Sequence, residues 1–139
     1  MAVPVVFVGH GGIAAGVRDA VCMILGDQPG LGTVSLPPNG STEELAEQLQ
    51  AELARLRAAD GEALVLADLM GGSPANAVGA LAMRTPALQL VSGLNLPMAL
   101  EVLTSTETTA AGLAEVALRA GREGVLDVAG RLREAMRSS

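Results

Sequence analysis

Apolar residues gather into short runs along this chain, and longer stretches with spaced apolar positions separate them. Four runs are continuous or nearly so: Val3–Val8, Leu31–Leu36, Glu62–Asp68 (apolar from Ala63 to Ala67) and Ala87–Ser92. Runs of this length without polar alternation are typical of strands that are buried on both faces. We therefore predict four strands of a parallel sheet.

The stretches between these runs have helical spacing and recognisable helix ends. A first helix follows Gly9–Gly12 and is expected to end at Gly26, a suitable C-cap. Ser41 and Glu44 form a capping box that predicts a helix to about Ala58. Further helices are expected from Ser73 (N-cap) to about Met83, from Pro97, and from about Thr108 to Arg119; the tail, Gly121 to Ser139, is expected to hold a short strand near Val125 and then a helix.

Strand and helix alternate four times, which is the pattern of an α/β protein. We predict a doubly wound, mainly parallel four-stranded sheet with helices on both faces and right-handed crossovers. Residues 1–139 are expected to form a single domain, because neither a linker nor an internal repeat divides them.

Several polar residues follow the predicted strands and should therefore share one rim of the sheet. His10 follows the first strand, Asp68 closes the third, Ser73 opens the next helix, and Asn95 follows the fourth. Ligands of such sheets bind beyond the carboxyl ends of the strands, where the strand order reverses. If the first and third strands are neighbours, His10 and Asp68 face each other there.

This pair has a clear chemical use. A carboxylate that accepts a hydrogen bond from one imidazole nitrogen fixes the tautomer and makes the other nitrogen more basic. No serine or cysteine stands beside His10 as a separate nucleophile. The imidazole is therefore predicted to act as the nucleophile itself.

The neighbouring glycines indicate the electrophile. Gly11 and Gly12 leave backbone N–H groups bare at a helix start, and Gly71-Gly72-Ser73 offers a second helix start with a hydroxyl. Helix N-termini attract anions through free donors and the helix dipole. Two of them converging on a histidine predict a phosphate site.

A dinucleotide-binding module is the alternative, because Gly9–Ala14 matches G-x-G-x-x-A after a strand. Such a module needs an acid at the end of the second strand, and Val34–Pro37 contains none. A third alternative is a regulatory dimer in which phosphorylation of His10 serves only as a signal.

Composition excludes other classes. The net charge is −6 without basic clusters, and one Phe is the sole aromatic residue, so neither nucleic acid nor a stacked sugar is an expected ligand. No apolar stretch is long enough to span a membrane, and the start lacks the basic region of a signal peptide. A single cysteine, Cys22, fits a reducing compartment, and we expect a cytoplasmic protein.

Three segments together resemble a known family. They are Gly9–Gly11, the stretch Asp68-Leu69-Met70-Gly71-Gly72-Ser73-Pro74-Ala75-Asn76, and Gly93-Leu94-Asn95-Leu96-Pro97-Met98 with Glu101; Gly121–Val125 is similar to its closing segment. In this order they resemble the IIA component of the mannose family of the sugar phosphotransferase system (PTS).

The resemblance implies a function. His10 would take a phosphoryl group on its ε nitrogen from the phosphocarrier HPr and pass it to a cognate IIB protein, expected to be a separate chain, while Asp68 would bind the δ nitrogen. The loops at Gly71–Ser73 and Gly93–Asn95 would shape the pocket, and Met70 and Leu96 are expected at an apolar rim that partners contact. We expect no metal and no cofactor, and contact with the membrane only through IIC and IID components.

The resemblance also implies a homodimer that exchanges a C-terminal antiparallel strand, for which the stretch around Val125 is the candidate. Two departures stand out, since many relatives have Ser or Thr where this chain has Gly9, and a large aromatic residue where it has Met70. The phosphotransferase subunit of dihydroxyacetone kinase also carries such a histidine, but it lacks the Gly-Gly-Ser-Pro and Asn-Leu-Pro-Met pieces.

Overall fold

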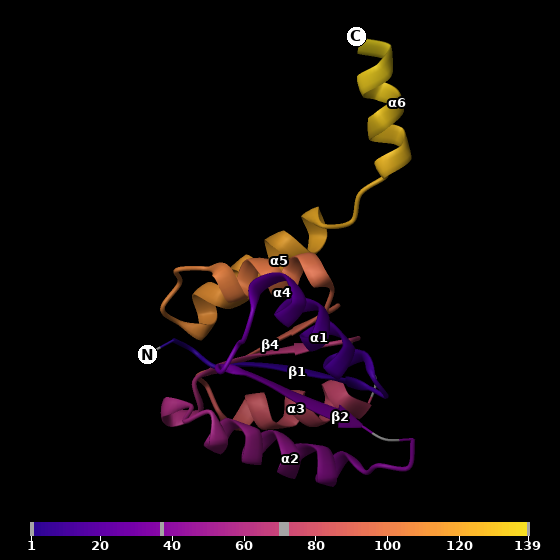
Figure 1. Ribbon diagram of the computed structural model, residues 1–139. Coiled ribbons are helices and arrows are strands. Elements are labelled where there is room, and N and C mark those ends of the chain that lie inside the picture. Colours follow the sequence, from indigo (N-terminus) through magenta and orange to yellow (C-terminus); the bar gives the residue numbers. More distant parts are fainter. Residues whose placement is uncertain (1, 37, 70–72, 139) are drawn as a thin grey trace.

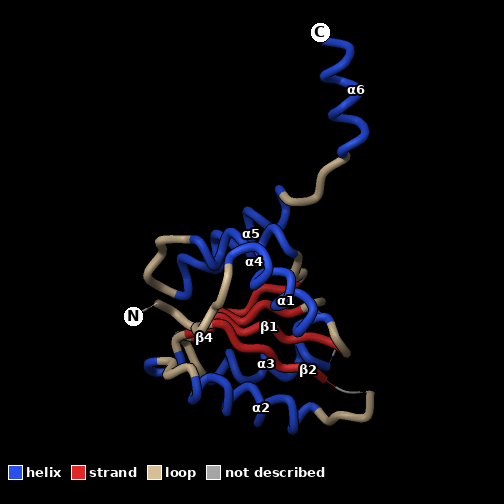
Figure 2. The backbone as a smooth tube through the Cα atoms, in the orientation of Figure 1, coloured by secondary structure: helices blue, strands red, loops and turns tan. Residues whose placement is uncertain are grey.

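The computed structural model describes residues 2–36, 38–69 and 73–138, leaving out the side chains of residues 73–75. Its centre is a parallel sheet with the strand order β2-β1-β3-β4, shown in red in Figure 2. The strands are β1 (Val5–His10), β2 (Leu31–Leu36), β3 (Ala63–Ala67) and β4 (Leu88–Ser92). All four strands were predicted, with boundaries that differ by at most two residues.

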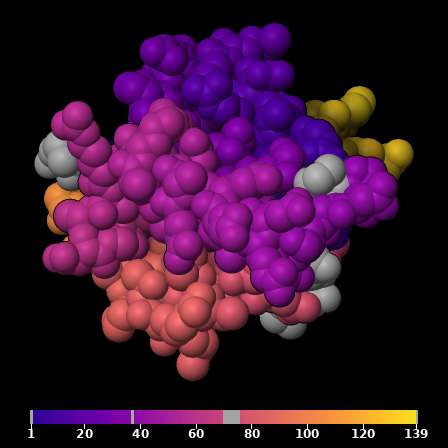
Figure 3. Space-filling model, turned by 90° about the horizontal axis from the view of Figure 1, so that it is seen from below, coloured from indigo at the N-terminus to yellow at the C-terminus, as the bar shows by residue number. Residues whose placement is uncertain are grey.

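Helices cover both faces of this sheet, as predicted (Figure 1). One layer contains α1 (Ile13–Leu25), α4 (Leu96–Thr104) and α5 (Ala110–Glu123); the other contains α2 (Thr42–Arg55) and α3 (Ser73–Arg84); a short 3₁₀ turn, η1 (Ala59–Gly61), precedes β3. Figure 3 looks onto the second layer, where α2 and α3 lie over the sheet.

The continuous apolar runs explain why β1 and β3 are the central strands. Val5 and Phe7 pack into the cluster beneath α1, α4 and α5, whereas Val6 and Val8 pack into the cluster beneath α2 and α3. Every residue of β3 is buried. Both strands need apolar side chains on both faces, because each face of the sheet is covered.

Most described helices begin at a side-chain cap. Ser41 Oγ accepts from Glu44 N before α2, Asn95 Oδ1 from Met98 N before α4, and Thr109 Oγ1 from Gly112 N before α5. The helix α1 differs, since Gly12 precedes it and no described side chain caps it. Gly26 is the C-cap of α1, as predicted, and its φ of 85° favours glycine.

The strand order places a switch point between β1 and β3. The chain leaves β1 toward β2 on one side, and it leaves β3 toward β4 on the other. A crevice at the carboxyl ends of the two central strands follows from this topology. The first and third strands are neighbours, which is the condition under which His10 and Asp68 were expected to face each other.

The C-terminal segment forms no strand within the single chain, and the strand exchanged in a dimer stays a prediction. Val125–Asp127 pairs with no described strand, so the strand expected near Val125 is not formed within the single chain. The helix α6 (Val128–Ser138) follows as expected, but none of its residues is buried and it projects away from the sheet (Figure 1). An edge strand needs a partner strand, and this segment is not paired within one chain.

Among the described residues, no helix has the length and apolar character needed to cross a membrane.

Candidate functional site

His10 and Asp68 meet at the switch point. His10 is the last residue of β1 and Asp68 follows the last residue of β3, in a register that pairs Val8 with Ala67. The ring Nδ1–H of His10 donates to Asp68 Oδ2 over 2.8 Å, and the backbone N–H of His10 donates to the same oxygen over 2.9 Å. One carboxylate oxygen therefore fixes both the position and the tautomer of the imidazole.

The two side chains differ in accessibility, which suits their different roles. The side chain of His10 is 46% exposed and that of Asp68 only 6%. Burial opposes ionisation of Asp68, but hydrogen bonds from the backbone and ring of His10, and from Leu69 N, hold the pKa of this carboxyl below its ordinary value. Asp68 is therefore an anchored anion, and the Nε2 edge of the ring is left for a reactant.

The start of α1 lies directly after His10. The N–H groups in the first turn of any helix have no partner within the helix. No described side chain caps α1, so these groups remain able to bind an anion. Gly11 needs its glycine, because its φ is 53°. The expectation of a bare N–H at Gly11 was wrong, since this group donates to Leu36 O over 3.2 Å.

The second predicted anion site falls largely outside the described residues. Met70, Gly71 and Gly72 belong to the part of the chain that is not described. Ser73 is the first residue of α3, whereas the prediction made it the N-cap that precedes the helix. The phosphate-binding roles of Gly71, Gly72 and Ser73 therefore remain predictions.

Asn95 and Leu96 have structural contacts at this rim. Asn95 Oδ1 caps α4 through Met98 N, and its Nδ2 donates to Gly121 O over 3.0 Å, which ties the start of α4 to the end of α5. Leu96 is half-buried and packs against the core cluster beneath α1, α4 and α5. Asn95 also lines a groove between α5 and β4. The pocket and partner-contact roles of Asn95 and Leu96 stay predictions.

Sequence reasoning gave no role to three residues near this site. Leu69 donates its N–H to Asp68 Oδ1 over 2.9 Å, and its side chain is 48% exposed. Ile13 begins α1 and is 46% exposed. Gly9 lies against the carboxylate of Asp68. A glycine at the end of a buried strand is a signal of close approach and could have identified the third.

The fold and the site define an α/β protein of the doubly wound class with an accessible imidazole, anchored by a nearly buried carboxylate, at its switch point. Comparison with known proteins gives the family. A family model described as "PTS system fructose IIA component" matches residues 4–117. The chain belongs to this family, and it is a mannose-family EIIA component of a sugar phosphotransferase system.

Individual relatives support this assignment. The chain is 35% identical over 106 residues to the sorbose-specific EIIA component of Klebsiella pneumoniae, covering 76% of each chain. It is 32% identical over 127 residues to the mannose-specific EIIAB component of Escherichia coli K12, covering 90% of this chain but 39% of that protein.

A solved structure agrees with both relatives. The mannose/sorbose-specific IIA subunit from Enterococcus faecalis superimposes with a TM-score of 0.84 at 29% identity, covering 92% of this chain and 96% of that chain. The dinucleotide-binding alternative is set aside by the family assignment. PTS EIIA components are phosphotransferase components, and this chain is one of them.

Proposed function

We propose that His10 carries a phosphoryl group in the cytoplasm, accepting it from phospho-HPr and passing it to a cognate IIB component during sugar uptake. The observation that supports this most directly is the 2.8 Å hydrogen bond from His10 Nδ1 to a nearly buried carboxylate, on a ring whose side chain is 46% exposed. A histidine held only for packing would not need an anchored anion on one nitrogen and access on the other.

The proposed transfer is a displacement at phosphorus. The lone pair of His10 Nε2 attacks the phosphorus atom, a new N–P bond forms, and the bond between phosphorus and the donor breaks. Its electron pair returns to the donor. Nδ1 keeps its proton, so the phosphorylated ring is cationic, and the Asp68 carboxylate stabilises it. The second transfer reverses these steps toward a nucleophile of the IIB component.

The start of α1 is proposed to hold the phosphoryl oxygens. Its uncapped first turn follows His10 directly, so its free N–H groups and helix dipole can stabilise negative charge there. Of the two glycines predicted to bind phosphate here, Gly12 keeps the proposed role, because the N–H of Gly11 already donates to Leu36 O. Gly71, Gly72 and Ser73 are proposed to complete the phosphate-binding site.

An apolar rim around the imidazole is proposed to meet both partner proteins. Ile13, three residues after His10, and Leu69, directly after Asp68, have exposed side chains, and Met70 is expected beside them. Apolar contacts around a small polar centre exclude water while the phosphoryl group passes between the two proteins. Alanine at Leu69 is expected to weaken transfer to IIB more than it changes labelling at saturating phospho-HPr.

The deciding experiment is incubation with phosphoenolpyruvate, enzyme I and HPr. We expect an acid-labile, alkali-stable phosphate on the chain, and none on His10→Ala, because His10 is the single histidine of the sequence. Labelling of the variant at the normal rate would contradict the assigned role. A labelled chain that passes nothing to any IIB component would support the regulatory alternative instead.

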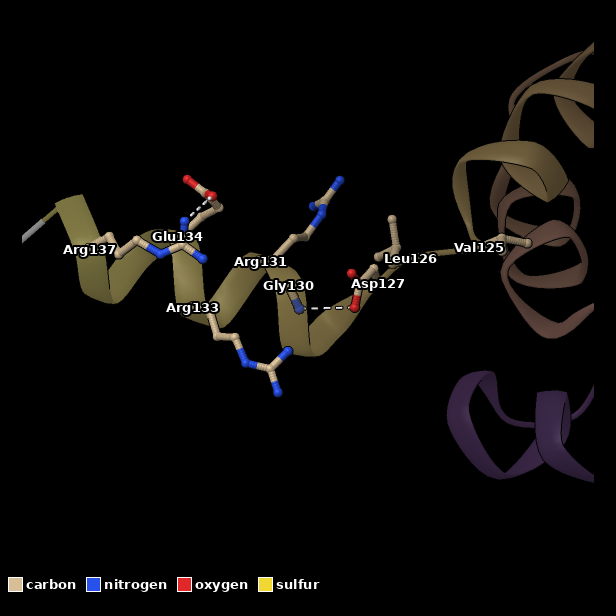
Figure 4. A pocket seen from close by; sticks show the side chains of 8 residues that line it. All are labelled: Val125, Leu126, Asp127, Gly130, Arg131, Arg133, Glu134 and Arg137. Carbon is tan, nitrogen blue, oxygen red and sulfur yellow. Dashed lines mark hydrogen bonds and ion pairs between the residues drawn. The ribbon is translucent and has the colours of Figure 1, made fainter.

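A homodimer is also proposed, because the C-terminal segment presents apolar side chains that one chain does not bury. Leu126, Val128 and Leu132 are exposed, while Arg131 and Arg133 extend into solvent from α6 (Figure 4). A groove of about 670 Å³ runs between α5 and β4, lined by Leu90, Ala114 and Leu118 among others. No described strand pairs with the outer edge of β4. The C-terminal segment of a second copy is the proposed occupant.

A further inference from the structure

Gly9 lies so close to Asp68 that a side chain at position 9 would make an unusually tight contact with the carboxylate. A Cβ atom at Gly9 would be 3.2 Å from Asp68 Oδ2 and 3.4 Å from Asp68 Cβ. Neighbouring strands are about 4.8 Å apart, so the Asp68 side chain leans across the end of β1. It leans toward His10, whose two N–H groups it reaches at 2.8 and 2.9 Å.

Backbone conformation does not explain this glycine. The described glycines with positive φ are Gly11, Gly26, Gly61 and Gly93, and Gly9 is not among them. Gly9 belongs to a regular strand, in which glycine is unfavourable compared with residues that have side chains. The empty space beside the carboxylate is therefore the structural feature that the glycine provides.

The hydrogen bonds of Asp68 show what this space protects. Oδ2 accepts two hydrogen bonds, both from His10, and Oδ1 accepts one from Leu69 N. A carboxylate oxygen has about two lone-pair sites, so His10 already occupies those of Oδ2. A hydroxyl on residue 9 would be within reach of this oxygen and would compete with the ring Nδ1–H.

We propose that Gly9 is a positioning residue that reserves Asp68 Oδ2 for His10 and thereby sets how strongly the phosphorylated imidazole holds its phosphoryl group. The inference rests on the proposed carrier function of His10. With a hydroxyl at position 9, the cationic phosphorylated ring would be less stabilised and would give up its phosphoryl group more readily. Transfer potential would then differ between chains that have glycine here and chains that have a hydroxyl residue.

The test compares Gly9→Ser and Gly9→Ala with the wild-type chain. Alanine adds the Cβ alone, so it separates crowding from competition for Oδ2. Gly16→Ser is the matched control, because a Cβ at Gly16 would meet nothing within 4 Å. Two quantities are measured: the NMR signals of His10 Nδ1 and its proton, and the equilibrium distribution of phosphate between HPr and this chain.

In Gly9→Ser we expect the Nδ1 proton signal to move upfield and the equilibrium to shift toward phospho-HPr by about threefold to tenfold, the effect of one shared hydrogen bond. Gly9→Ala should fall between Gly9→Ser and the wild type, and Gly16→Ser should match the wild type. An equilibrium within twofold of the wild type in Gly9→Ser would overturn the proposal. So would a shifted equilibrium with an unmoved Nδ1 signal. If the wild-type chain accepts no phosphate, the carrier function fails, while the NMR comparison still tests Gly9.

Discussion

At the scale of single residues, the charge of Asp68 is as important as its shape. Asp68→Asn keeps the size of the side chain but removes the negative charge that stabilises a cationic ring. We expect the variant to fold and to slow phosphoryl transfer through His10 by at least about tenfold. Single-turnover labelling from phospho-HPr measures this, and a cooperative unfolding transition is the control that the variant is folded. Unchanged kinetics would reduce Asp68 to a turn residue.

The lowered pKa of Asp68 also predicts how stability depends on pH. A carboxyl with a lower pKa in the folded than in the unfolded state stabilises the fold above the unfolded value of about 3.9. This contribution is lost as the pH falls through the folded pKa. The wild type should therefore exceed Asp68→Asn in urea midpoint at pH 7, and the gap should narrow below about pH 4. A gap that stays constant to pH 3 would show that ionised Asp68 contributes no stability.

The central pair could be predicted from sequence because it depends only on strand ends. His10 and Asp68 each follow an apolar run, and parallel strands bring their carboxyl ends to one rim. The bonding of Gly11 and Asn95 could not be predicted in the same way. It depends on which distant backbone group comes within reach, here Leu36 O and Gly121 O, and residue spacing does not reveal this.

At the scale of elements, two glycines let the end of α5 pack tightly against the start of α4. A Cβ at Gly124 would be 2.5 Å from Pro97 Cβ and 2.6 Å from its Cγ, whereas one at Gly121 would be 2.5 Å from Met98 Cε. The proline ring cannot move aside, but the end of a methionine side chain can.

We therefore expect Gly124→Ala to lower the free energy of unfolding by about 1–3 kcal/mol, the usual effect of overpacking. Gly121→Ala should stay within about 1 kcal/mol of the wild type, because the gain in helix propensity offsets the displaced methionine. Urea unfolding of both variants gives the comparison. A Gly121→Ala chain that is the less stable of the two would show that Met98 is the rigid side of this contact.

Sequence patterns predicted the elements with internal contacts better than the one that lacks them. The four strands and their helices bury apolar runs within one chain, so local pattern and final structure agree. The strand expected near Val125 needs a partner edge, which the pattern of one chain does not supply. The helix α6 follows this unpaired segment, and none of its residues is buried.

At the scale of the whole molecule, α6 contrasts with the body of the protein. The chain has a net charge of −6, but α6 carries Arg131, Arg133 and Arg137 against the single acid Glu134. The same helix places Val128 and Leu132 four residues apart, on one face. A basic helix with an apolar stripe is suited to an acidic body with a groove lined by both polar and apolar side chains, which a second copy would present.

This contrast gives a prediction about the association of two copies of the chain. Leu126→Asp combined with Leu132→Asp puts charges where the second copy is proposed to bury apolar side chains, a change that such interfaces tolerate poorly. We expect the wild type to sediment as a dimer at micromolar concentration and the double variant as a monomer. Gly16→Ser on α1, where an added Cβ meets nothing within 4 Å, is the control and should remain dimeric. Phosphate acceptance should survive in the monomer, because His10, Asp68 and the start of α1 all belong to one chain. A double variant that dimerises like the wild type would mean that the two chains associate through another surface.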